Sequence, residues 1–211
     1  MSTLQVNTIS ESTSASGVTI DGVLIKDGLV DGKDVSTLGT SSSDGGFQHI
    51  DTTTFSSVSS FTKSSVFSAS HDIYRIFLTQ SASDTANAQA WFQLSASGTA
   101  LETNYVGKRI YDHLTNSSFT HSVTSTTNGF YIADPGGGLD EFFVGDIVLA
   151  NPFATKKTVY KSDSTGNYAT AYYRQRAYGY VNNDISYDGY KIKFNSGTYT
   201  GKVSVYGLAL S

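Results

Sequence analysis

Segments in which every second residue is apolar recur along most of this chain. A period of two residues is typical of a β-strand with one buried face, and no long window keeps the 3.6-residue apolar repeat of a helix. Four such faces consist of Tyr74, Ile76 and Leu78; Ala90, Phe92 and Leu94; Phe143, Ile147 and Leu149; and Tyr190, Ile192 and Phe194. The sequence therefore predicts an all-β fold.

About ten such segments lie between Phe47 and Leu210, and Asn-Gly, Asp-Gly and Ser-Gly dipeptides fall at the expected turns, which favours an antiparallel β-sandwich of jelly-roll type. A closed barrel is the alternative. The composition agrees with an all-β chain, because it has 20 Gly, 14 Tyr and 15% charged residues but few helix formers. A Tyr-rich chain with so little charge is typical of an extracellular or particle-bound protein.

The charge and cysteine content exclude several classes of protein. The 14 basic and 18 acidic residues give a net charge of −4, and the basic residues form no long stripe, so we expect no nucleic-acid partner. The absence of Cys excludes disulfides and thiolate metal sites. We expect no membrane span and no signal peptide, because the apolar runs are short and the N-terminus reads MSTLQVNTIS.

The N-terminal stretch SGVTIDGVLIKDGLVDG alternates short apolar runs with Asp-Gly dipeptides, which favour tight turns. The runs Val18-Thr19-Ile20 and Val23-Leu24-Ile25 have the β-branched content of strands, but strands of about three residues are marginal by themselves. Their apolar side chains therefore need a further surface. We predict that this surface is the same segment of sister chains, with contacts through Val18, Ile20, Val23, Leu24 and Ile25.

A polar, Gly-rich stretch from Ser36 to Gly46 has the composition of a linker or sharp bend. We place the domain boundary there. Residues 1–45 are then a docking and oligomerisation segment with its linker, and residues 46–211 are the β-sandwich domain.

The opening LQVNTISESTSASGVTIDGVLIKDG resembles the start of virion structural proteins of tailed phages, notably phages of cyanobacteria and marine bacteria. The segments YRIFLTQ, YYRQRAYGYVNNDIS and GKVSVYGLAL resemble the distal β-domains of fibres from such phages. The resemblance implies a homotrimer in the virion, with intertwined N-terminal strands, an outward β-domain and other tail or capsid proteins as partners. It does not identify which appendage carries the chain.

The stretch from Tyr168 to Tyr180 is the most informative candidate for recognition. Read as one strand, it places six residues on one face: Tyr168, Tyr172, Arg174, Arg176, Tyr178 and Tyr180. Flat amphipathic rings and planar donors are typical of sugar recognition and of protein interfaces, and half-buried sheet tyrosines are the alternative. Trp91 alternates with Gln89 and Gln93, so we expect an exposed ring or a ring packed on a neighbouring subunit. We therefore predict a glycan or partner site of Trp91, Tyr172, Arg174, Arg176 and Tyr178.

Catalytic, metal and cofactor signals are weak. The loop from Asp134 to Glu141 is rich in Gly and carboxylates but lacks the spacing of a phosphate or calcium loop. The histidines, His49, His71, His113 and His121, show no metal-ligand spacing, and His113 has no nucleophile motif beside it. We therefore expect no metal, no cofactor and no enzymatic activity.

These observations favour a structural phage protein, a homotrimeric tail fibre or spike subunit that recognises a host surface glycan. A head decoration or head fibre protein is the first alternative. A capsular polysaccharide depolymerase is the second, although the chain lacks the solenoid repeat of a long β-helix.

Overall fold

The computed structural model describes residues 18–20, 23–26, 29–30, 33–34, 46–84, 89–113, 119–126, 128–133, 142–168 and 171–208. The regular elements in these ranges are all β-strands, as predicted. The chain divides into two units, Met1–Asp44 and Gly45–Ser211, a division adjacent to the expected boundary. Apart from Gly46, the linker that we predicted from Ser36 to Gly46 lies outside the described residues.

The first unit contains four short strands, β1 (Val18–Ile20), β2 (Val23–Lys26), β3 (Leu29–Val30) and β4 (Lys33–Asp34). They pair antiparallel in chain order, β1-β2-β3-β4. β1 and β2 begin where the sequence predicted strands, while the three Asp-Gly dipeptides lie outside the described residues. A sheet of strands this short has little capacity to be stable alone, and so packing against sister chains remains our prediction.

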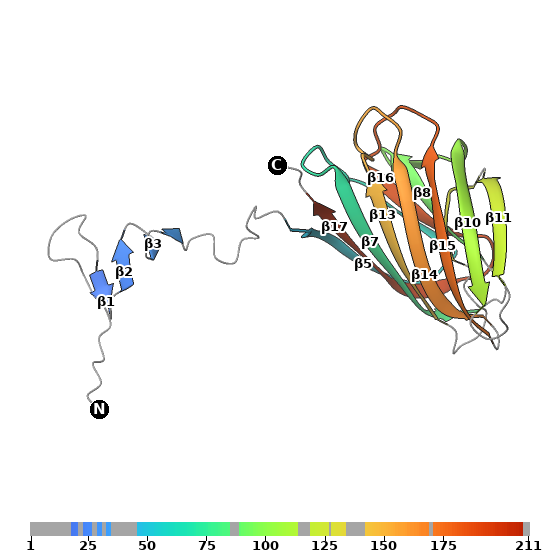
Figure 1. Ribbon diagram of the computed structural model, residues 1–211, viewed down its shortest axis with the longest axis horizontal. Coiled ribbons are helices and arrows are strands. Elements are labelled where there is room, and N and C mark those ends of the chain that lie inside the picture. The colour runs from blue at the N-terminus through green and yellow to red at the C-terminus, as the bar shows by residue number, and fades with distance from the viewer. Residues whose placement is uncertain are drawn as a thin grey trace. The chain divides into compact units, whose positions relative to one another are not determined.

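The second unit is built on an eight-stranded sheet of order β11-β10-β15-β14-β13-β7-β17-β5, with every neighbouring pair antiparallel (Figure 1). Its strands are β5 (Gln48–Val58), β7 (Ile73–Ser83), β10 (Tyr105–His113), β11 (Phe119–Thr126), β13 (Phe143–Ala150), β14 (Val159–Tyr168), β15 (Ala171–Val181) and β17 (Tyr199–Leu208).

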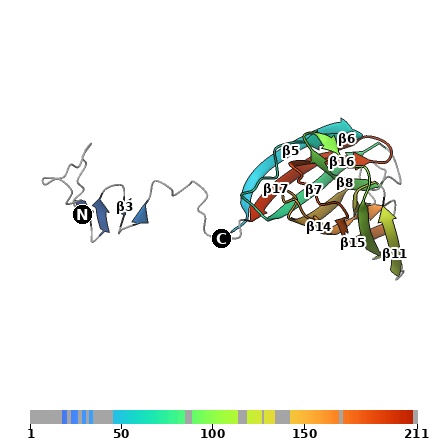
Figure 2. The ribbon, with the colours of Figure 1, turned by 90° about the horizontal axis from the view of Figure 1, so that it is seen from above.

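A smaller sheet of order β12-β8-β16-β6 covers one face of the first, as Figure 2 shows for β6, β16 and β8. Its strands are β6 (Ser60–Lys63), β8 (Ala90–Ala96), β12 (Phe130–Ala133) and β16 (Gly189–Phe194), and β9 (Thr99–Ala100) pairs with β8. The antiparallel sandwich is therefore confirmed. A jelly roll has eight strands in total, whereas eight lie in the first sheet alone, so this sandwich has more strands than a simple jelly roll.

The core lies between the two sheets and contains all four apolar faces predicted from the alternating pattern. Aromatic rings dominate it. The ring centroids of Phe130 and Tyr160 are 3.8 Å apart in a stacked arrangement, and those of Phe92 and Tyr190 are 5.1 Å apart. Contacts of this kind add to the free energy gained from burying the rings, about 1.5 to 3 kcal/mol for each large apolar side chain.

Buried polar side chains close one edge of the sandwich. Ser162 Oγ donates to the carbonyl oxygen of Tyr131 at 3.1 Å, and Gln175 Nε2 donates to that of Ile132 at 3.3 Å. Ser162 and Gln175 belong to β14 and β15, while Tyr131 and Ile132 belong to β12 at the edge of the smaller sheet. These hydrogen bonds give the buried polar side chains a partner and fix β12 against β14 and β15.

Candidate functional site

Strand β15 displays aromatic and cationic side chains on the outer face of the large sheet. Tyr172, Arg174, Arg176, Tyr178 and Tyr180 are exposed, whereas the alternate residues Tyr173, Gln175, Ala177 and Val181 are buried. Tyr172 is 53% exposed and Tyr178 47% exposed. The predicted face is therefore confirmed from residue 172 to residue 180.

The prediction that Tyr168 continues this strand is wrong. Tyr168 is the last residue of β14 and pairs with Ala171, the first residue of β15. The stretch therefore forms two antiparallel strands, because the chain reverses direction between these two residues. The period-two pattern did not reveal the break, since Ala and Tyr occur on both sides of it.

The pairing of strands surrounds Tyr178 with cations. Lys108 of β10 lies opposite Tyr178 on one side and Lys161 of β14 lies opposite it on the other. Arg176 precedes Tyr178 by two residues and lies on the same face of β15. All four side chains are exposed. We refer to Lys108, Lys161, Arg176 and Tyr178 as the Tyr178 patch.

Two carboxylates beside this patch, Asp163 and Asp146, are held by other arginines. Arg174 Nε donates to Asp163 Oδ1 at 3.0 Å and its Nη2 donates to Asp163 Oδ2, while Arg75 binds Asp146 in the same bidentate way. These hydrogen bonds raise the pKa of both guanidinium groups, with the charge of each carboxylate acting in the same direction. Surface pairs of this kind stabilise the fold little but orient their side chains well.

Two hollows flank the Tyr178 ring. One, of about 440 Å³, is lined by Asp146, Val148, Lys161, Ser162, Asp163, Arg176, Ala177 and Tyr178. The other, of about 400 Å³, is lined by Lys157, Val159, Tyr160, Tyr178, Gly179 and Tyr180. Tyr178 contributes to the lining of both, together with the cations Lys161 and Arg176 in the first and Lys157 in the second.

The prediction of an exposed Trp91 ring is wrong, because only 7% of this residue is exposed. Its neighbours on the same face of β8, Gln93 and Ser95, are buried completely. Gln93 Nε2 donates to Glu102 Oε2 at 3.0 Å and to the carbonyl oxygen of Asn128 at 2.7 Å, and the first bond is the largest cause of a lowered pKa at Glu102. Segments near β9 and β12 thus cover the face that the alternation assigned to solvent.

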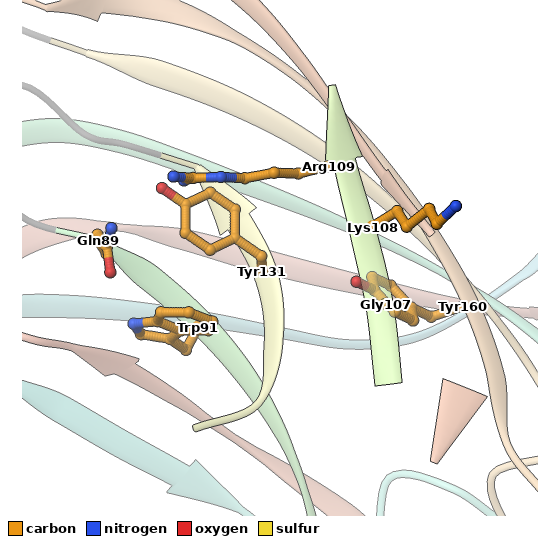
Figure 3. Close-up of a pocket in the computed structure, with 7 residues that line it drawn as sticks. All are labelled: Gln89, Trp91, Gly107, Lys108, Arg109, Tyr131 and Tyr160. Carbon is orange, nitrogen blue, oxygen red and sulfur yellow. The ribbon is translucent and has the colours of Figure 1, made fainter. Parts of the chain in front are cut away.

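Trp91 instead lines a small cavity of about 120 Å³, together with Gln89, Gly107, Lys108, Arg109, Tyr131 and Tyr160 (Figure 3). The Trp91 and Tyr131 rings meet edge to face with centroids 4.8 Å apart. The guanidinium carbon of Arg109 lies 4.4 Å from the centroid of the Tyr131 ring. Among these lining residues none comes from β15, so the structure does not bring Trp91 together with Tyr172, Arg174, Arg176 and Tyr178.

The histidines and the carboxylate-rich loop, for which we expected no metal, are placed only in part by the structure. Within the part of the chain that the structure describes, no group of three or more His, Asp or Glu side chains is arranged to hold a metal. His49 Nε2 is 2.8 Å from Thr52 Oγ1, and His71 Nε2 is 3.3 Å from Gln48 Oε1. The side chains of His113 and His121, and the loop from Asp134 to Glu141, lie outside the described residues. No helix among the described residues is long and apolar enough to cross a membrane.

Sequence reasoning missed the cations that complete the Tyr178 patch. Lys108 lies far from Tyr178 in the sequence and Lys161 lies on the preceding strand, and both meet Tyr178 only through the pairing of β10 and β14 with β15. In β10 two cations, Lys108 and Arg109, are adjacent, so alternation alone does not indicate which of them lies on the outer face. The sequence carries no signal for which strands become neighbours.

No protein family model matches this chain, and neither a curated protein nor a solved structure matches it.

Proposed function

We propose that this protein is a non-enzymatic subunit of a tailed-phage appendage, a homotrimeric tail fibre or spike whose sandwich domain binds a glycan on the host surface. The exposed Tyr and Arg side chains of β15 are the observation that carries this proposal. The resemblance of both ends of the chain to fibre proteins supports the virion location. The four short N-terminal strands, which need further cover, support the trimer.

The chemistry of the β15 face suits a sugar chain. A tyrosine ring packs against the apolar face of a pyranose and loses little conformational entropy on binding, because only two torsions are fixed. Arginine supplies planar donors to hydroxyl and ring oxygens. Tyr172 and Tyr178 stand six positions apart on one strand, so at about 3.3 Å per residue their Cα atoms are about 20 Å apart along β15, the length of several sugar units.

Competition with virions for host cells tests this function. Host cells incubated first with the purified protein are expected to adsorb fewer phage particles, because the protein occupies their receptor. A head decoration or head fibre protein has no receptor to occupy and leaves adsorption unchanged. Undiminished adsorption at saturating protein would therefore remove the receptor-binding role and favour the head alternative.

The Tyr178→Ala protein is expected to compete about tenfold less well than the unmodified protein, the loss of about 1.4 kcal/mol of aromatic contact. Its thermal midpoint should stay within a few degrees, since the side chain is 47% exposed. Phe153→Ala is the matched control, because Phe153 is also an exposed aromatic, at 37%, but lies outside β15. Equal effects of the two substitutions would contradict the assignment of the face.

Incubation of the protein with polysaccharide extracted from host cells is expected to release no reducing ends. The sequence carries no nucleophile motif, and a glycosidase needs two carboxyl groups at a defined separation. On the Tyr178 patch, the nearby carboxylates of Asp146 and Asp163 are each bound by an arginine. A colorimetric assay of reducing sugar over time measures this directly, and a release that scales with protein concentration would identify a depolymerase instead.

A further inference from the structure

We propose that the glycan bound at the Tyr178 patch is an acidic polysaccharide, whose carboxylate or sulfate groups bind Lys108, Lys161 and Arg176 while a sugar ring packs on Tyr178. This inference rests on the proposed function and specifies its ligand class. It follows from the distribution of charge on the outer face of the large sheet, where cations without a carboxylate partner gather in a protein of net charge −4.

Strand pairing places the three cations on three adjacent strands. Lys108, Tyr178 and Lys161 form one row across β10, β15 and β14, and Arg176 belongs to the next row, between Ile110 and Asp163. Directly opposite residues on antiparallel strands have Cβ atoms about 5 Å apart. Each of the two lysines is therefore within reach of a ligand that lies on the Tyr178 ring.

The three carboxylates nearest these cations belong to other arginines: Asp112 of β10 lies opposite Arg174, and Asp146 and Asp163 are bound in bidentate pairs. Both oxygens of Asp163 accept hydrogen bonds from Arg174, and both oxygens of Asp146 accept hydrogen bonds from Arg75. Among the described residues, Lys108, Lys161 and Arg176 form no ion pair, in contrast to Lys63, Lys191 and Lys193 elsewhere in the sandwich. The patch is thus positively charged, and an anionic ligand is its electrostatic complement.

A fourth cation extends the patch towards the second hollow. Lys157 Nζ lies 5.6 Å from the centroid of the Tyr180 ring, and both residues line the depression of about 400 Å³ beside Tyr178. Cations therefore line both hollows to which Tyr178 contributes. A linear chain with an acidic group on repeated sugar units places charge at regular intervals along such a surface.

A polysaccharide suits this patch better than a nucleic acid or a lipid surface. Nucleic-acid binding at physiological salt depends on many phosphate contacts, commonly 6 to 10, whereas the rest of the protein is acidic overall. Aromatic rings separated by hollows accommodate pyranose units and their substituents. Single-stranded RNA and anionic vesicles are accordingly negative controls in the test.

The test measures binding of the full-length protein to polygalacturonate, dextran sulfate and unmodified dextran. Dextran and dextran sulfate share one backbone, so their comparison isolates the acidic group, and polygalacturonate separates carboxylate from sulfate recognition. We expect binding to at least one acidic polymer, none to dextran, and an affinity that falls about tenfold or more as NaCl rises from about 20 to 500 mM, because salt screens exposed charges.

Substitutions identify the residues involved. Arg176→Gln and Lys161→Gln are each expected to weaken binding about tenfold, the value of one charge-assisted hydrogen bond. Lys202→Gln is the matched control, because Lys202 is an exposed lysine on β17 of the same sheet, away from the patch. Asp163→Asn is expected to strengthen binding, since it releases Arg174 from its ion pair.

Several outcomes would overturn the ligand class. Binding of extracted host polysaccharide that is insensitive to salt and to Arg176→Gln would leave glycan recognition standing but exclude an acidic ligand. Equal affinity for the acidic polymers and for single-stranded RNA or anionic vesicles would indicate capture of any polyanion. If the protein bound neither polygalacturonate nor dextran sulfate, the inference would also be contradicted, whatever the result of the adsorption experiment.

Discussion

A protein carrying both Ile20→Asp and Leu24→Asp is expected to be a monomer of 22.6 kDa in light scattering, whereas we expect about three times that mass for the unmodified protein. Ile20 ends β1 and Leu24 lies within β2, in a sheet whose strands have two to four residues. Burying one such side chain between chains stabilises a trimer by about 1.5 to 3 kcal/mol, and a buried, unpaired carboxylate reverses the gain. With two changes in each of three chains, the interface is expected to fail completely.

The sandwich domain should remain folded in this variant, because residues Met1–Asp44 and Gly45–Ser211 form separate units. Near-ultraviolet circular dichroism from the buried Trp91 measures this independently of mass. Lys26→Asp is the control, since it changes the charge of β2 at a position that is already polar. A monomeric unmodified protein at micromolar concentration would contradict the predicted trimer.

Gly179→Ala is expected to destabilise the sandwich domain by about 3 kcal/mol, a fall of about 6 to 12 °C in the thermal midpoint. A Cβ atom at this position would lie 2.0 Å from the carbonyl oxygen of Val106 and 2.8 Å from the Tyr160 ring. Val106 and Gly107 belong to β10, which pairs with β15 at this point. The clash is therefore with backbone, and its relief requires the two strands to separate beside the Tyr178 patch.

Gly46→Ala provides the matched control for this prediction, because a Cβ atom there would meet nothing within 4 Å. Its thermal midpoint is expected to remain close to that of the unmodified protein. If Gly179→Ala unfolded at the same temperature as Gly46→Ala, the close approach of β10 and β15 would be wrong, and with it the position of Lys108 opposite Tyr178.

The sequence predicted the strands well because their signal is local. Alternation identified the buried positions Tyr74, Ile76 and Leu78 without knowledge of any partner strand. Strand order is a different problem, since it depends on contacts distant in sequence. Thr52 Oγ1 and Ser204 Oγ, for example, are 3.1 Å apart across 152 residues, and no local pattern specifies that β5 and β17 become neighbours.

The part of the candidate site that lies on one strand was predictable from local alternation, and the part that depends on neighbouring strands was not. The exposed face of β15 follows from its own alternation, and so Tyr172, Arg174, Arg176 and Tyr178 lie where we expected. The exposure of Trp91 was predicted wrongly because alternation indicates that one face of β8 is buried but does not indicate whether other segments cover the opposite face. Lys108 was missed because its position opposite Tyr178 arises from the pairing of β10 with β15. Lys161 was missed because its position follows from the β14-β15 hairpin, which the alternation did not reveal.

Electron microscopy of virions labelled with an antibody against this chain tests most directly the central claim that it is a receptor-binding subunit of a tail appendage. The antibody should bind the exposed side chains of β15, so that the position of the label reports the recognition face. We predict label at the free ends of tail fibres or spikes, and loss of host adsorption by labelled particles. Label on the head alone, or none on the virion, would contradict the account.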